Sequence, residues 1–150
     1  MISRIMIIGP RQSGKTTIAN AINGVEDEVQ QGVQDIRYGE YTMDMPSGYL
    51  ETPWMYDYLI ASAQDAAVVF FLVDPTAINR TYPPGFSKSF SGIHCGVITK
   101  SDIATSEQLE WAKGELENIG IESNIIVSSA ATGEGISQLL EYRKYCTQRY

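Results

Sequence analysis

The stretch from Gly9 to Thr16, GPRQSGKT, has the residue types of a phosphate-binding loop at the required spacing. It fits the pattern GxxxxGK followed by Ser or Thr, in which glycines let backbone N–H groups surround phosphate oxygens. In such a loop Lys15 reaches the β- and γ-phosphates as the catalytic lysine, and Thr16 binds Mg²⁺. The alternative is a glycine-rich turn without a ligand. The residues expected at the phosphates are Gly9, Pro10, Arg11, Gln12, Ser13, Gly14, Lys15, Thr16 and Thr17.

Asp44 is a candidate for the second metal ligand. It follows Thr16 by 28 residues and ends a predicted strand, in the stretch TMDMPSGYLE. A carboxylate there can hold a water on Mg²⁺ opposite Thr16. The alternative is an ordinary turn aspartate.

Two further polar stretches follow predicted strands and are suited to binding a purine base. Thr99 and Lys100 open TKSD, where the Asp102 carboxylate can accept the N1–H and the exocyclic amine of guanine. Adenine, whose N1 carries no proton, would be disfavoured. In SSA, the Ser129 hydroxyl can brace Asp102 and the Ala130 N–H can face the base oxygen. Taken alone, each stretch is more typical of a solvated turn, and the order of the motifs along the chain is what favours a base site.

The elements that must position these residues alternate between strands and helices. This order predicts an α/β fold with a mostly parallel sheet and helices on both faces. We expect strands at residues 4–8, 38–43, 66–73, 94–99 and 124–127, and helices at residues 15–23, 53–62, 106–119 and 136–145. Ser106 is the expected N-cap of the third helix. The proline-rich residues 76–90 are expected to form one long surface loop.

Composition narrows the class of protein. A chain of 150 residues predicts a single domain over residues 1–150. Lys and Arg number 11 against 18 Asp and Glu, a net charge of −7, which argues against broad nucleic-acid or anionic-membrane surfaces. Cys95 and Cys146 have no metal-ligand spacing, and no apolar run reaches the length of a membrane span. We therefore expect a cytoplasmic protein.

The chain resembles the EutP/PduV family of ethanolamine and propanediol utilisation proteins over nearly its whole length. The resemblance rests on RIMIIGPRQSGKTT, MDMPSGYLE, VITKSD and VSSAATGEGI. It implies a Ras-like phosphate-loop fold with a six-stranded sheet and an association with bacterial microcompartments, whose shell or enzyme proteins would be partners. It also implies Mg²⁺ and a purine nucleotide, GTP or GDP, or ATP or ADP, as cofactors.

Several positions depart from Ras-type switches. Ser47 stands where DxxG has its γ-phosphate-sensing glycine, and Gly48 or Tyr49 takes the place of the water-orienting Gln, which predicts slow hydrolysis. The stretch QQGVQDIRYGE contains no switch threonine. Arg11 occupies a loop position where Ras-type enzymes need glycine, and we expect it at the surface. Thr99 replaces the Asn that ties the base motif to the phosphate loop, which predicts modest base discrimination.

Three functions remain open at this point. The first is a purine-nucleotide switch or slow GTPase. The second is an ATP-dependent acetate kinase, a role with which the family has been credited, in which Arg11, Arg80 or Lys88 binds the acceptor carboxylate. The third is a pseudo-GTPase scaffold that binds nucleotide weakly and acts through partner contacts.

Overall fold

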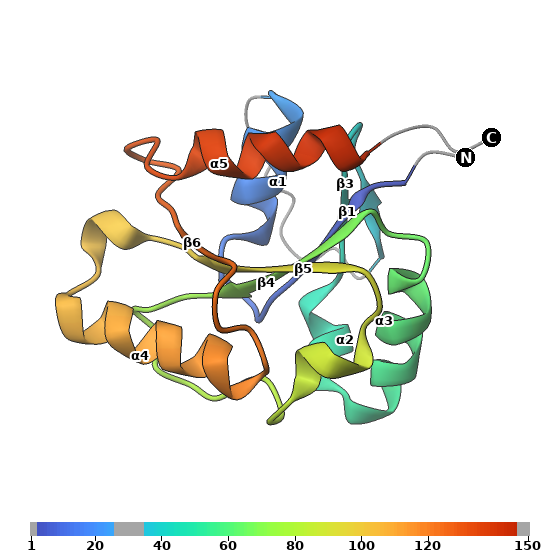
Figure 1. Ribbon diagram of the computed structural model, residues 1–150, viewed down its shortest axis with the longest axis horizontal. Coiled ribbons are helices and arrows are strands. Elements are labelled where there is room, and N and C mark those ends of the chain that lie inside the picture. The colour runs from blue at the N-terminus through green and yellow to red at the C-terminus, as the bar shows by residue number, and fades with distance from the viewer. Residues whose placement is uncertain (1–2, 26–34, 147–150) are drawn as a thin grey trace.

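The computed structural model describes residues 3–25 and 35–146, which are built around a six-stranded sheet (Figure 1). The strands lie in the order β2-β3-β1-β4-β5-β6, and the one antiparallel pair of this described sheet is β2 with β3. The expected α/β class with a mostly parallel sheet is confirmed. The strands are β1 (Ile5–Ile8), β2 (Arg37–Tyr38), β3 (Thr42–Asp44), β4 (Val68–Val73), β5 (Ile93–Ile98) and β6 (Ile125–Val127).

The strand predicted over residues 38–43 is in fact two strands joined by a tight turn, β2 and β3. At the turn, the Gly39 N–H donates to the Thr42 carbonyl over 2.8 Å. Asn23 packs against this turn from α1 (Lys15–Asn23): its Nδ2 donates to Thr42 Oγ1, and its Oδ1 accepts from the Tyr41 N–H. A Cβ at residue 39 would collide with the Asn23 amide, so a larger residue there would displace Asn23 from the turn.

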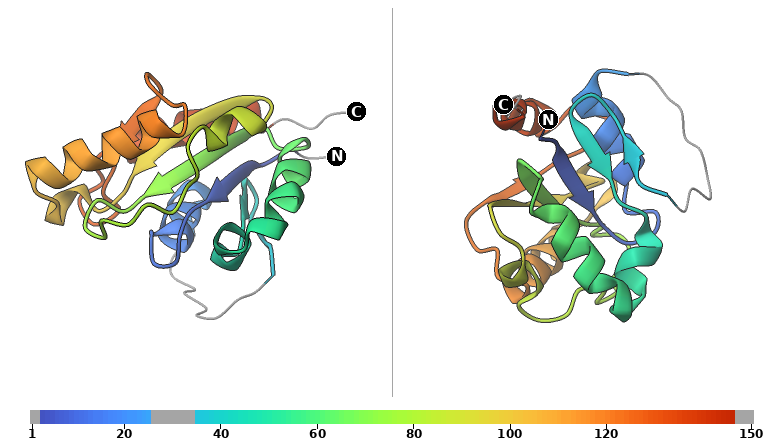
Figure 2. Two further views of the ribbon diagram at one scale, coloured as in Figure 1. Left: turned by 90° about the horizontal axis from the view of Figure 1, so that it is seen from below. Right: turned by 90° about the vertical axis from the view of Figure 1, so that its right-hand side faces the viewer.

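Helices cover both faces of the sheet, as expected (Figures 1 and 2). Side chains alternate along β1, because successive residues of a strand point to opposite faces. Ile5 and Ile7 pack with α1 and α5, whereas Met6 and Ile8 pack with α2, α3 and α4. The remaining helices are α2 (Ser47–Glu51), α3 (Tyr56–Ala63), α4 (Ser106–Asn118) and α5 (Ile136–Leu140).

Two helices differ in their extent from the predictions. The helix predicted at residues 53–62 begins as a 3-10 turn, η1 (Pro53–Met55), and continues as α3. The preceding α2 was not predicted. The helix predicted at residues 136–145 is α-helical only as far as Leu140 and then tightens into the 3-10 turn η4 (Glu141–Tyr145). Among the described residues, none of these helices combines the length and the apolar character needed to cross a membrane.

The prediction of one long surface loop at residues 76–90 is wrong for its second half, because aromatic side chains anchor that part in the core, whereas residues 77–80 are exposed and irregular. Tyr82, Phe86 and Phe90 are buried and pack around Phe71 of β4 in edge contacts. Part of the segment forms a 3-10 turn, η2 (Phe86–Ser89). The prolines had suggested a solvated loop, but the aromatic residues between and after them determine where it packs.

The N-cap of α4 is Thr105 and not the predicted Ser106. The Gln108 N–H donates to Thr105 Oγ1 over 3.1 Å, and the Thr105 N–H donates to Gln108 Oε1 over 2.9 Å. This reciprocal pair is a capping box, which satisfies two amides at the helix start. Thr105 has the extended backbone that an N-cap needs, whereas Ser106 already belongs to the helix.

We predict that Thr105→Ala lowers the free energy of unfolding by about 1 kcal/mol, because it removes the capping hydroxyl. Urea denaturation followed by circular dichroism measures this change. Ser106→Ala is the matched control and should change stability by less than about 0.5 kcal/mol. A larger loss for Ser106→Ala than for Thr105→Ala would contradict the assignment.

Candidate functional site

Residues 9–16, which comprise the loop after β1 and the first two residues of α1, lie at the carboxyl end of the sheet. This stretch, called the 9–16 loop below, is shaped by two glycines. A Cβ on Gly9 would stand 2.5 Å from Ser13 Oγ, so a larger residue would displace the loop. Gly14 has a φ of 101°, in the left-handed region that favours glycine, and offers no side-chain cap to α1. The first-turn amides of α1 therefore remain available to an anion.

The half-buried Lys15 and the buried Asp44 lie near each other at this loop. The Lys15 ammonium donates to the Pro10 carbonyl over 3.2 Å. Burial lowers the pKa of Lys15, an effect that the neighbouring Asp44 partly offsets. Burial also raises the pKa of Asp44, although Lys15 and a hydrogen bond from Thr16 act in the opposite direction. The protein alone thus leaves both charged groups incompletely compensated.

Asp44 and Thr16 meet because β1 and β3 run parallel. The register pairs Ile7 with Asp44, which puts the carboxylate beside the 9–16 loop. Thr16 Oγ1 donates to Asp44 Oδ2 over 3.3 Å. A hydroxyl next to a carboxylate provides the hard oxygen ligands that Mg²⁺ prefers, and a cation there would compensate the buried carboxylate.

The TKSD stretch is tied to the 9–16 loop by two side chains. Thr99 Oγ1 donates to the Ser13 carbonyl over 2.7 Å, and Lys100 Nζ donates to the Gln12 carbonyl over 2.8 Å. Sequence comparison with Ras-type switches had suggested that Thr99 gives up the tie made by Asn. That expectation is wrong, because the threonine hydroxyl reaches the loop carbonyl itself.

The loops that follow β5 and β6 meet at Asp102 and Ser129. Ser129 Oγ donates to Asp102 Oδ1 over 2.8 Å, the hydrogen bond that the sequence predicted. Ser129 is buried, whereas Asp102 and Ala130 are exposed. The serine thus fixes one carboxylate oxygen and leaves the carboxylate open to a ligand.

Glu134 is a neighbour of this loop pair that the sequence did not reveal. Its carboxylate accepts a short hydrogen bond from Ser101 Oγ, and its carbonyl accepts from the Ser129 N–H over 2.9 Å. Nothing in SSAATGEG marks this acid, because its partner lies 33 residues away in the chain.

Asp74 is the main site residue that sequence reasoning missed. It follows β4 directly, and its Oδ2 accepts from Lys100 Nζ over 2.7 Å. Its Oδ1 accepts from both the N–H and the hydroxyl of Thr76. Burial acts to raise the pKa of Asp74, but the hydrogen bonds from Lys100 and Thr76 outweigh it and lower the pKa. An acid at the carboxyl end of the most buried strand was the available signal.

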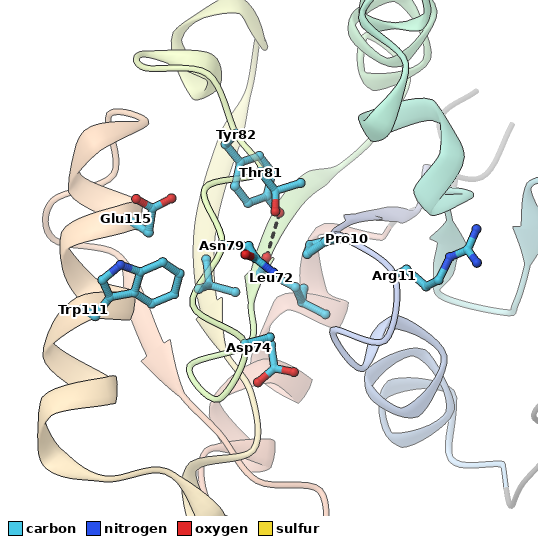
Figure 3. A pocket seen from close by; sticks show the side chains of 11 residues that line it. Pro10, Arg11, Leu72, Asp74, Asn79, Thr81, Tyr82, Trp111 and Glu115 are labelled. Atoms are coloured by element: carbon cyan, nitrogen blue, oxygen red, sulfur yellow. Dashed lines mark hydrogen bonds between the residues drawn. The ribbon is translucent and has the colours of Figure 1, made fainter.

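A small cavity of about 70 Å³ lies beside the 9–16 loop (Figure 3). Asp74 and Glu115 contribute carboxylates to its wall, and Trp111 contributes an indole ring. Figure 3 shows the guanidinium of Arg11 directed away from Asp74 and Glu115. Arg11 is exposed, as predicted, and its charge helps to lower the pKa of Lys15.

Two of the three residues predicted to bind an acceptor carboxylate are poorly placed to do so. Arg80 Nε lies 3.1 Å from Glu115 Oε1, in an ion pair with a buried carboxylate. Lys88 packs by Gly120, at the C-terminal end of α4 and thus at the end of the sheet opposite the 9–16 loop. Lys88 therefore lies away from the 9–16 loop, and Arg80 is already in an ion pair.

The parallel sheet, the glycine loop before α1 and the polar loops after β5 and β6 define the class, a Ras-like phosphate-loop GTPase fold. A crystal structure of Era from Aquifex aeolicus bound to GDP and aluminium fluoride shares the fold. Its TM-score is 0.66 at 18% identity, with 100% of this chain and 59% of that chain covered.

The chain belongs to the PduV-EutP family of ethanolamine utilisation and propanediol utilisation proteins, whose profile matches residues 2–145. It is 30% identical to the propanediol utilization protein PduV of Citrobacter freundii, with 92% of this chain and 91% of the relative covered. It is 24% identical to the probable acetate kinase EutP of Escherichia coli K12, with 99% and 93% covered.

We predict that Thr99→Val lowers the free energy of unfolding of the nucleotide-free protein by about 1–2 kcal/mol. The substitution keeps the side-chain shape but leaves the Ser13 carbonyl without its donor. Urea denaturation gives the change. Thr17→Val, at an exposed position of α1, serves as control with an expected change below about 0.5 kcal/mol. Wild-type stability in Thr99→Val would mean that the hydrogen bond does not support the loop.

Proposed function

We propose that the chain binds a purine nucleotide together with Mg²⁺ and acts as a GTPase-like protein of ethanolamine or propanediol utilisation. The observation that carries this proposal is the Ser129–Asp102 hydrogen bond, which fixes an exposed carboxylate in loops that are tied to the 9–16 loop. A bare glycine-rich turn would not need such a carboxylate, whereas a guanine base does.

The phosphate end of the proposed site is the 9–16 loop with the start of α1. Its backbone amides and Lys15 would hold the phosphates, with Thr17 in the first turn of the helix. Thr16 and Asp44 would hold Mg²⁺, and the bound ion would neutralise phosphate charge. The incomplete compensation of Lys15 and Asp44 supports this assignment, because an anion and a cation would supply what each group lacks.

The base end of the proposed site is formed by Thr99, Lys100, Asp102, Ser129 and Ala130. Thr99 and Lys100 set the distance between base and phosphates through their bonds to the loop. The Asp102 carboxylate would accept the two N–H groups on the edge of guanine, and the Ala130 N–H would donate to the base oxygen. We therefore favour GTP and GDP over ATP and ADP.

Hydrolysis by this site would be slow without a helper protein. The segment after Asp44 is wound into α2 from Ser47 onward. Tyr49, which follows Gly48 in this segment, packs its ring against Tyr58 in an edge contact at 5.3 Å. No side chain of residues 47–49 is a glutamine or another amide that could orient a water.

The family resemblance supports a cytoplasmic location at or in a bacterial microcompartment, with shell or enzyme proteins as partners. The net charge of −7 supports a protein partner over a nucleic acid. The microcompartment location requires more than nucleotide binding, because a shell or enzyme protein must also recognise the surface of this chain.

An ATP-dependent acetate kinase is the second candidate, and the name printed for the Escherichia coli relative favours it. The same loop, lysine and Mg²⁺ serve phosphoryl transfer to an acceptor. Against it, Arg80 is paired with Glu115, and Lys88 lies at the other end of the sheet. Of the three predicted acceptor ligands, Arg11 is the one that remains available.

Calorimetric titration of the nucleotide-free protein with GDP, GTP, ADP and ATP in Mg²⁺ tests the proposal. We expect tight guanine nucleotide binding and its loss in Lys15→Ala, because the phosphates lose their ammonium partner. Product analysis with acetate separates the candidates: acetyl phosphate formed from ATP would establish the kinase. Absence of binding to all four nucleotides would overturn the proposal, and weak binding without turnover would favour the scaffold.

Asp102→Asn should reduce the preference for GDP over ADP by about tenfold or more, equal to about 1.4 kcal/mol, because the amide cannot accept both guanine N–H groups. Ser129→Ala should reduce it less, since the carboxylate stays but loses its brace. The GDP-to-ADP ratio of dissociation constants measures both. An unchanged ratio in Asp102→Asn would remove the base assignment.

A further inference from the structure

Asp74 belongs to a chain of hydrogen bonds that ends at the 9–16 loop. Thr76 holds Asp74 Oδ1 with its N–H over 2.8 Å and with its hydroxyl over 2.6 Å. The other oxygen, Oδ2, accepts from Lys100 Nζ over 2.7 Å. Lys100 Nζ also donates to the Gln12 carbonyl over 2.8 Å. The carboxylate is thus oriented from one side and binds the ammonium from the other.

Gln12 and Lys100, which are joined by one of these hydrogen bonds, both have unfavourable backbone conformations. Gln12 has a φ of 62° and Lys100 a φ of 57°, and in the part of the chain that the structure describes they are the non-glycine residues with positive φ. Such conformations are unfavourable for residues other than glycine and persist where the surroundings hold them. The Nζ hydrogen bonds supply this support for both residues at once.

The burial of Asp74 makes its contact with Lys100 stronger than a surface ion pair. The Asp74 side chain is 7% exposed and the Lys100 side chain 35% exposed. A buried, oriented carboxylate restricts the ammonium to one position, whereas an exposed pair would be loosened by water and salt.

We propose that Asp74 is the positioning residue for Lys100, holding the lysine across the gap between the 9–16 loop and the TKSD stretch. The inference rests on the proposed function in one respect, that Lys100 lies along the nucleotide. Asp74 itself would not touch the ligand. It would act through the lysine, so its removal would matter only while Lys100 is present.

Glu115 provides a matched control for Asp74. Both carboxylates are buried in the wall of the same cavity (Figure 3), and each pairs with one cation. Glu115 pairs with Arg80, and among the described residues no hydrogen bond or ion pair joins either of them to the 9–16 loop. A general effect of losing a buried carboxylate should therefore appear in both Asp74→Asn and Glu115→Gln, and a positioning effect only in the first.

The first experiment is a double-mutant cycle on GDP affinity. Asp74→Asn keeps one oxygen to accept from Thr76 but replaces the oxygen that accepts from Lys100 with an amide nitrogen. We therefore expect GDP binding to weaken about tenfold. In the Lys100→Met background the same change should cost less than about twofold. Glu115→Gln should stay within about twofold of wild type. Equal losses for Asp74→Asn in both backgrounds would overturn the proposal.

The second experiment needs no nucleotide and decides the case even if the proposed function fails. Hydrogen exchange of the nucleotide-free protein reports on the amides of residues 100–103, including the Ser101 N–H that donates to the Ser128 carbonyl. We expect at least about fivefold faster exchange there in Asp74→Asn and no change in Glu115→Gln. Thr76→Val, which loosens the carboxylate without removing it, should give a smaller increase in the same amides. Wild-type exchange in both Asp74→Asn and Thr76→Val would overturn the positioning role.

Discussion

The site depends on hydrogen bonds made to the carbonyl groups of the 9–16 loop. Pro10, Gln12 and Ser13 each turn a carbonyl toward a side chain, from Lys15, Lys100 and Thr99 respectively. A loop that aims its amides at an anion must leave its carbonyls on the other side, where they need donors of their own. Two of these donors come from the loop after β5, so the conformation of residues 9–16 is set largely by a distant part of the chain.

The sheet makes these long-range contacts possible, because parallel strands bring their carboxyl ends to the same end of the sheet. The connection between β4 and β5 supports this end of the sheet through Tyr82. The Tyr82 hydroxyl donates to the Leu72 carbonyl over 2.7 Å and lies 3.2 Å from the Ile8 carbonyl, which directly precedes the loop. Burial raises the pKa of Tyr82, so the hydroxyl stays a donor at this position.

The sequence was sufficient where local pattern decides the outcome. The apolar run before Asp74 and the glycine spacing around Lys15 predicted a buried strand and a loop that are both present. Failures came where residues distant in the sequence make contact: Asn23 binds the turn at residues 39–42, and Lys100 binds Asp74. The contact of Ser129 with Asp102 could be predicted because each residue follows a predicted strand, and parallel strands bring their carboxyl ends to the same end of a sheet. Part of the stretch examined for a switch threonine, residues 30–34, lies outside the described residues.

The lengths of the outermost strands bear on how copies of this chain can meet. In the described sheet the edge strands β2 and β6 have two and three residues, whereas the interior strands β4 and β5 have six each. Edges this short offer few unpaired backbone groups to another strand, which is a common protection against edge-to-edge aggregation. A second copy or a partner would thus find side chains of the covering helices and loops to recognise, and recognition would depend on surface chemistry and not on extension of the sheet.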